Sequence, residues 1–300
     1  MIARPLWLAQ HERGSRHLMR TIAAIALGIG RPAGRLLLYP ICAYFVLFSR
    51  SARHASRQYL RRVLGRPPLW RDVFRHYHCF AATILDRVFL LSGRFQYFKY
   101  EIEGLDELLA GMASGRGCLL VGAHFGSFEV LRVMAQAEAP VRLRVLMHPQ
   151  NAAKINSVLG ALNPVVVRDM IILGRPQTML EVRDAIDAGE IVGMLADRVV
   201  AGDRLVACDF LGGTAHFPVG PFLLGELLHA PVIMFSAACR GDGCYRIRFT
   251  PGPGAGPIPH DKAALAAKCQ GFASWLENSC RDDPYNWFNF YDFWATPPHD

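Results

Sequence analysis

Residues 115–129 read GRGCLLVGAHFGSFE, and this stretch decides the fold class. The opening glycines are typical of a turn, and the apolar run Cys118–Ala123 is typical of a buried strand. Gly126 and Ser127 indicate the start of a helix, with Ser127 as its expected N-cap. A buried strand that leads directly into a helix is the repeating unit of α/β proteins, which place their ligands at the carboxyl ends of strands. His124 stands at such an end.

The same alternation continues along the chain from about residue 101. Further strands are predicted at Leu143–Met147, Val165–Val167, Ile191–Ala196, Val232–Ala237 and Tyr245–Thr250. Helices are predicted near residues 127–138, 150–161, 176–188, 219–229 and 262–280, and a loop is predicted over Gly252–Pro259. Short apolar runs that alternate with amphipathic helices predict an α/β fold with a layered, largely parallel sheet flanked by helices.

The charge is concentrated at the amino-terminal end. Residues 1–100 hold 17 of the 33 Lys and Arg residues but only three of the 25 acidic residues, so this third carries a net charge of +14 and the remaining 200 residues carry −6. Such asymmetry indicates an anionic partner. The basic residues are interleaved with long apolar runs and not with a nucleic-acid-binding motif. The pattern therefore favours an anionic membrane surface and argues against nucleic acid.

Two apolar runs lie within this basic third, Ile22–Gly30 and Leu36–Phe48, separated by RPAGR. The second run has 13 residues, fewer than the roughly 20 that span a bilayer. A joined span would hold two Arg and a Pro near its centre, which is costly. We therefore expect an N-terminal hydrophobic helical membrane anchor, hairpin-like or in the membrane plane. Residues 1–65 are expected to form this anchor and residues 66–300 the catalytic domain; a pair of buried core helices is the alternative for the apolar runs.

The eight cysteines show no CxxC motif and no companion histidine cluster. This usage is typical of reduced thiols in a cytosolic environment, and we propose no metal site.

His124 is followed five positions later by an acid, Glu129. Chance supplies about one such spacing in a chain with 11 His and 25 acids among 300 residues, so the spacing alone proves little. The position of His124 after a buried strand carries more weight. A histidine there can take a proton from an attacking hydroxyl or amine, while a carboxylate behind it fixes the tautomer and stabilises the imidazolium. The chain has no G-x-S-x-G, P-loop or H-E-x-x-H motif that would indicate another chemistry. A structural histidine is the alternative.

Three blocks follow one another along the chain: HFGSFE at 124–129, AGEIVGMLADR at 188–198 and FLGGTAHFPVG at 210–220. In this order they resemble the lysophospholipid acyltransferase superfamily, marked by a His-x4-Asp/Glu motif, and within it the branch of bacterial lipid A biosynthesis acyltransferases. HFGSFE at 124–129 is similar to the HFGNWE-like block of that branch. AGEIVGMLADR at 188–198 and FLGGTAHFPVG at 210–220 are similar to its next two blocks. The ending, PYNWFNFYDFW at 284–294, is instead similar to a group of predicted acyltransferases associated with aryl polyene or related pigment-lipid pathways.

The resemblance implies transfer of an acyl group from an acyl-carrier-protein or acyl-coenzyme A thioester to a hydroxyl or amine of a lipid, without a cofactor. It implies His124 as general base, Glu129 as its partner, and the cytoplasmic face of the cell inner membrane as the location. It further implies substrate contacts at Gly126, Ser127, Asp197, Arg198, Gly212 and Gly213.

Arg198 stands where the lipid A branch commonly has Gln, which argues against a lipid A acceptor. A lipid A (Kdo2-lipid IVA type) late acyltransferase proper nevertheless remains one alternative. The others are a hydrolase of lipid esters and a non-catalytic membrane-bound lipid-binding protein.

Overall fold

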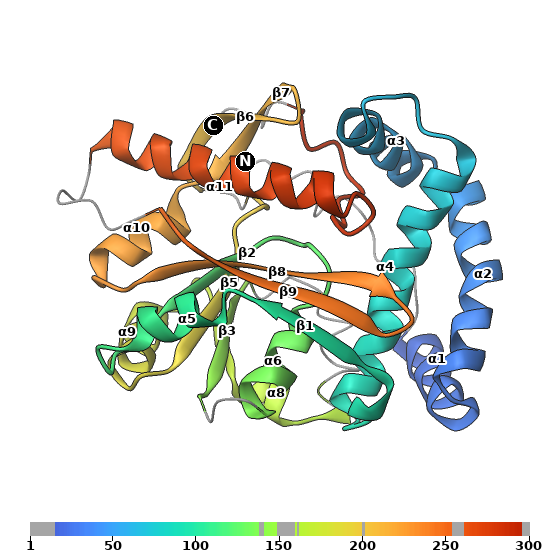
Figure 1. Ribbon diagram of the computed structural model, residues 1–300, viewed down its shortest axis with the longest axis horizontal. Helices are drawn as coiled ribbons and strands as arrows, with labels where there is room; N and C mark the ends of the chain where they lie inside the picture. The colour runs from blue at the N-terminus through green and yellow to red at the C-terminus, as the bar shows by residue number, and fades with distance from the viewer. Residues whose placement is uncertain are drawn as a thin grey trace.

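A computed structural model describes residues 16–137, 141–148, 160, 162–199, 202–253 and 261–295. Its centre is a seven-stranded sheet with the order β1-β9-β8-β2-β5-β3-β4 (Figure 1). Neighbouring strands are parallel throughout, except that β8 and β9 form an antiparallel pair. The strands are β1 (Lys99–Glu103), β2 (Leu119–Gly122), β3 (Leu143–Met147), β4 (Met170–Ile172), β5 (Ile191–Leu195), β8 (Val232–Gly241) and β9 (Cys244–Pro251). The expected α/β fold with a largely parallel sheet is confirmed.

Helices cover the sheet, as expected from the amphipathic segments between the strands. In Figure 1, α11 lies above the central strands and α5, α6 and α9 lie below them. A two-stranded antiparallel hairpin, β6 (Leu205–Phe210) and β7 (Gly213–Pro218), packs against α11. In the described segments after β1, the helices are α5 (Leu105–Met112), α6 (Phe128–Ala137), α8 (Val165–Arg168), α9 (Thr178–Asp187), α10 (Gly220–Leu227) and α11 (Lys262–Asp282).

Within the described residues, four helices precede the sheet and lie together at one side of it (Figure 1). They are α1 (Arg16–Ile29), α2 (Arg31–Phe48), α3 (Arg50–Leu64) and α4 (Trp70–Leu91), and a short 3-10 turn at Phe95–Tyr97 leads from them into β1. Buried residues of α2 and α3, such as Leu38 and Tyr59, belong to the same hydrophobic core as the strands. The first four helices are therefore packed onto the sheet domain.

The expected N-terminal membrane anchor is not found as a spanning helix. No single helix within the described residues combines the length and the hydropathy that crossing a bilayer requires. Helices α2 and α3 meet those criteria only jointly, as a pair bent by 96°.

One predicted strand is wrong. Val165–Val167 forms the short helix α8, although three consecutive valines favour a strand. The backbone N–H of Val165 donates to Asn163 Oδ1 at 3.0 Å, and Pro164, whose ring fixes φ, starts the helical turn. The strand, β4, begins two residues after this helix ends, at Met170. All of the predicted helix near 150–161 except residue 160, and most of the predicted loop at 252–259, lie outside the described residues.

Candidate active site

Two neighbouring parallel strands end at the same level and position the two central side chains. Strand β2 pairs with β5 so that Gly122 lies opposite Leu195. His124 and Asp197 each follow two residues later, at the carboxyl edge of the sheet. This register explains why side chains 73 positions apart in the chain meet.

The carboxylate of Asp197 contacts His124 twice. Its Oδ1 lies 2.7 Å from the imidazole Nδ1, and its Oδ2 accepts the backbone N–H of His124 at 2.9 Å. The Asp197 side chain is only 3% exposed, whereas the imidazole is 22% exposed and therefore accessible. A carboxylate at Nδ1 holds a proton on that nitrogen, so Nε2 becomes the basic nitrogen of the neutral ring.

The surroundings favour the neutral imidazole. Burial, together with the positive charges of Arg198 and Arg87, lowers the pKa of His124, although Asp197 acts in the opposite direction. Burial pushes the pKa of Asp197 upward, but His124 and Arg198 outweigh this effect, and the pKa lies below its ordinary value. The ring is thus kept unprotonated and able to accept a proton at neutral pH.

Glu129 does not occupy the position expected for it. Its carboxylate is buried in the first turn of α6 and pairs with Arg87 of α4, with Oε2 2.9 Å from the guanidinium Nε. The carboxylate that bonds the imidazole is Asp197. Glu129 therefore ties α6 to α4 through an ion pair, and its link to His124 runs through Arg87, whose charge acts on the imidazole. The expected pairing of Glu129 with the imidazole is replaced by this arrangement.

The loop between β2 and α6 is held by close backbone contacts. Gly126 has φ +63°, and a Cβ at this position would lie 1.7 Å from the carbonyl oxygen of Ala237. The Gly126 N–H donates to the Asn286 carbonyl at 2.9 Å, and the Ser127 N–H donates to the Ala237 carbonyl at 2.9 Å. Only glycine fits this backbone, so the structure assigns Gly126 a conformational role beside the predicted substrate contact.

Ser127 directly precedes α6 but does not cap it. Its side chain is buried, and its Oγ has no hydrogen-bond partner among the described residues. The expected N-cap bond is therefore wrong. The hydroxyl is left for another partner.

The remaining predicted residues lie on two different segments. Arg198 follows Asp197 and is close enough for its charge to act on both Asp197 and His124. Gly212 lies in the turn between β6 and β7 with φ +70°, and Gly213 is the first residue of β7. The guanidinium of Arg62 donates to the carbonyl of Leu211 in the same turn at 3.2 Å. Substrate contact at Gly212 and Gly213 stays a prediction.

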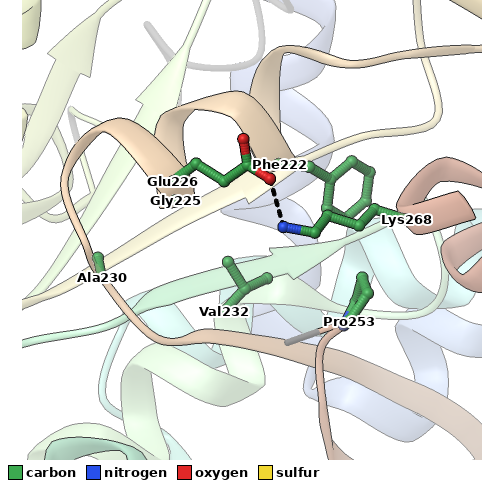
Figure 2. A pocket seen from close by; sticks show the side chains of 7 residues that line it. All are labelled: Phe222, Gly225, Glu226, Ala230, Val232, Pro253 and Lys268. Atoms are coloured by element: carbon green, nitrogen blue, oxygen red, sulfur yellow. Dashed lines mark hydrogen bonds and ion pairs between the residues drawn. The ribbon is translucent and has the colours of Figure 1, made fainter. Parts of the chain in front are cut away.

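A small cavity lies away from His124, between α10, β8 and α11 (Figure 2). Glu226 and Lys268 point toward one another there and form a buried ion pair. The remaining lining residues are Phe222, Gly225, Ala230, Val232 and Pro253. The space measures about 10 Å³, roughly the room that one water molecule needs. It is too small for an acyl chain.

Around His124 and Asp197, three residues that make contacts were not predicted from the sequence. Arg87 lies on α4, far before the motif, and only the packing of α4 on α6 brings it close. Asn286 and Trp287 belong to the aromatic ending, and the indole N–H of Trp287 donates to Asp197 Oδ2 at 2.9 Å. The tryptophan in this ending was the one signal in the sequence, because an indole N–H that becomes buried needs a polar partner.

The chain matches the family model described as bacterial lipid A biosynthesis acyltransferase over residues 79–296, more than two thirds of its length. No curated protein matches it closely. The family match covers the strand ends that hold His124 and Asp197, the hairpin and the whole aromatic ending. It confirms the expected branch and the expected enzyme class, whereas the association with aryl polyene pathways stays a prediction. The chain therefore belongs to the bacterial lipid A biosynthesis acyltransferase family and is an acyltransferase that acts on lipid.

Proposed function

We propose that this enzyme moves an acyl group from a carrier-protein or coenzyme A thioester to a hydroxyl or amine of a lipid, with His124 as general base. Nε2 of His124 takes the proton of the acceptor as its oxygen or nitrogen attacks the thioester carbonyl. The C–S bond then breaks, and the departing thiolate takes the proton back from the imidazolium. The enzyme forms no covalent intermediate, and no cofactor takes part.

One observation carries this proposal: the buried carboxylate of Asp197 lies 2.7 Å from Nδ1 of a partly exposed imidazole. The carboxylate orients the ring and stabilises the positive charge that it gains during proton transfer. Asp197 therefore has the role that the spacing of the motif suggested for Glu129. Glu129 acts on the site indirectly: it pairs with Arg87, whose positive charge acts on the imidazole.

Two residues close to His124 and Asp197 in the chain, Ser127 and Arg198, have side chains suited to bind the substrate. The guanidinium of Arg198 places a positive charge near His124, and an arginine binds phosphate well through paired N–H donors. We propose that Arg198 binds a phosphate of the thioester donor or of the acceptor lipid. The buried hydroxyl of Ser127 has no partner in the described part of the protein, and we propose that it donates to a substrate oxygen.

The proposed location is the cytoplasmic face of the cell inner membrane. Large apolar side chains are exposed along α2, among them Leu36, Leu47 and Phe48. The following helix, α3, carries arginines that suit anionic headgroups. An enzyme held at the membrane surface by these helices meets a lipid acceptor that lies in the same surface.

The test is an assay of the full chain in isolated membranes with a labelled acyl thioester, given once on a carrier protein and once on coenzyme A. Wild type is compared with His124→Ala, Asp197→Asn and Glu129→Gln. Removal of the base or of its charged partner should lower the rate of lipid acylation by roughly 10²–10⁴-fold. Glu129→Gln should have the smaller effect on the rate at saturating substrate, because Glu129 does not bond the imidazole.

Three results would count against the proposal. Lipid acylation by His124→Ala at the wild-type rate would remove the general base. A larger loss in Glu129→Gln than in Asp197→Asn would return the partner role to Glu129. Rapid release of free acid without any lipid acceptor would identify a hydrolase.

A further inference from the structure

The ending of the chain runs directly beside the loop that carries His124. Phe125 and Trp287 form an antiparallel bridge. The Phe288 N–H donates to the carbonyl of His124 at 2.7 Å, and the Asn286 carbonyl accepts from Gly126. Three successive residues of this segment therefore bond to or pair with the three residues His124 to Gly126.

Trp287 adds a side-chain contact to this backbone pairing. Its indole N–H donates to Asp197 Oδ2 at 2.9 Å, the same oxygen that accepts the backbone N–H of His124. The indole is fully buried and packs edge-on against Tyr59 and Phe210, with ring centroids 5.0 and 5.2 Å away. The ring is thus held by aromatic contacts with α3 and with β6.

The backbone of Trp287 is fixed as well. Its carbonyl oxygen lies 2.8 Å from Nε2 of His76, whose Nδ1 lies 2.9 Å from Ser56 Oγ. These contacts connect the indole to α3 and α4. An anchored donor can hold the plane of the Asp197 carboxylate in one orientation.

We propose that Trp287 is a positioning residue that sets both the orientation and the basicity of Asp197. This inference rests on the proposed function, because it concerns the carboxylate that serves the base His124. With two N–H donors on Oδ2, Oδ1 remains directed at the imidazole Nδ1, and part of the carboxylate charge is neutralised. The acceptor of this buried N–H is the carboxylate of Asp197 itself, whereas the indole N–H of Trp294 donates to a backbone carbonyl.

The removal of this N–H has two distinct consequences. The carboxylate loses a constraint on its orientation, so kcat falls while substrate binding is largely preserved. The carboxylate also becomes more basic and stabilises the imidazolium more strongly, so the pKa of His124 rises. The acidic limb of the pH–rate profile then moves to higher pH, because the base must be unprotonated.

The experiment compares Trp287→Phe with Trp294→Phe in the full chain. Trp294 is a matched control, because it lies in the same ending, contacts the same Phe210 and donates its indole N–H to a backbone carbonyl, that of Phe210, at 3.2 Å. Trp287→Phe should lower kcat roughly tenfold, the effect of one hydrogen bond to a charged group. It should leave KM nearly unchanged and shift the acidic limb upward. In Trp294→Phe the limb should stay in place.

A second variant covers the case in which phenylalanine at position 287 prevents folding. Incorporation of 3-benzothienylalanine replaces the indole N–H by sulfur at nearly the same shape, and it should reproduce the loss of kcat and the shift of the limb. A wild-type kcat and limb in this variant, or the same behaviour in both Trp→Phe variants, would overturn the positioning role. His124→Ala measured in parallel separates the two claims: an active His124→Ala enzyme would refute the proposed function itself. If His124→Ala is inactive but the variants at position 287 keep the wild-type kcat and acidic limb, only the positioning role is refuted.

Discussion

At the residue scale, the sequence pointed to His124, the proposed base, but not to the carboxylate that contacts its imidazole. His124 could be recognised because it follows a buried strand, a feature that is local in the chain. The partner depends on which strand lies beside β2 and on the register that sets Gly122 opposite Leu195. A spacing of five residues could not reveal that pairing. Asp197 was recognised as part of the site through its block, but its contact with the imidazole required the sheet.

Arg198 provides a test of the electrostatics at the same scale. Its positive charge disfavours the imidazolium and helps to lower the pKa of His124. In Arg198→Gln this effect is removed, so the pKa of His124 rises and the acidic limb of kcat/KM moves to higher pH. The measurement is a pH–rate profile beside that of Arg183→Gln, an exposed arginine on α9. A limb that stays in place in Arg198→Gln, or shifts downward, would contradict this assignment.

At the element scale, the sequence predicted the segments with strong periodicity. Leu143–Met147 is predicted with the bounds that the structure shows, because a short apolar run between turns admits few alternatives. Strand β1 was missed because it is an edge strand with only two apolar residues in the sequence KYEIE. The hairpin β6–β7 was missed as strands because polar residues such as Asp209 and His216 interrupt its apolar pattern. The valines of α8 show the opposite case, in which the preceding Asn163 and Pro164 outweigh strand propensity.

The packing of α3, α4 and the C-terminal segment gives a prediction on stability. His76 of α4 is fully buried between Ser56 and the carbonyl of Trp287, and burial lowers its pKa to about 4. The unfolded chain, with an ordinary histidine pKa of about 6.5, takes up a proton first as the pH falls. The contribution of His76 to the free energy of unfolding is therefore fully present above about pH 6.5 and is lost as the pH falls toward 4.

Between pH 7.5 and pH 5 this histidine should cost the folded state about 2 kcal/mol. His76→Gln carries no titrating group, so its free energy of unfolding should depend less on pH by about that amount. Denaturant unfolding of both proteins at the two pH values measures the difference. An equal pH dependence in wild type and variant would show that His76 is not the group responsible.

At the scale of the whole molecule, helix α2 has two apolar faces. Gly34, Leu38, Cys42 and Val46 recur at four-residue steps and are buried, in line with the packing of α2 against α4. The opposite face is exposed at Leu36, Tyr44, Leu47 and Phe48. A helix that only serves a core exposes a polar outer face, and this one does not.

The exposed apolar side chains are concentrated on this side of the protein. Of the 16 large apolar residues exposed in the described part of the chain, ten lie between residues 25 and 70. They include Trp70, over which Arg53 and Arg57 place their guanidinium groups at 5.7 and 5.0 Å from the ring centroid. Apolar side chains beside arginines suit the boundary between acyl chains and anionic headgroups. We therefore propose that the enzyme rests on the bilayer through α1 and α2.

Vesicle flotation tests this arrangement. The triple variant Leu36→Ser, Leu47→Ser, Phe48→Ser should weaken binding to vesicles of phosphatidylethanolamine and phosphatidylglycerol by roughly 10²-fold, because each lost side chain contributes about 1 kcal/mol when partly inserted. The matched control removes three exposed apolar residues elsewhere, Leu109, Met179 and Leu227, also by serine. The control should float like wild type, since those side chains are scattered over α5, α9 and α10.

Binding by wild type should also fall with added salt, as the arginines lose their attraction for the anionic surface. Equal losses in the two triple variants would exclude α2 as the membrane-facing element. Full binding by the α2 variant would place the contact with the bilayer on another surface of the molecule.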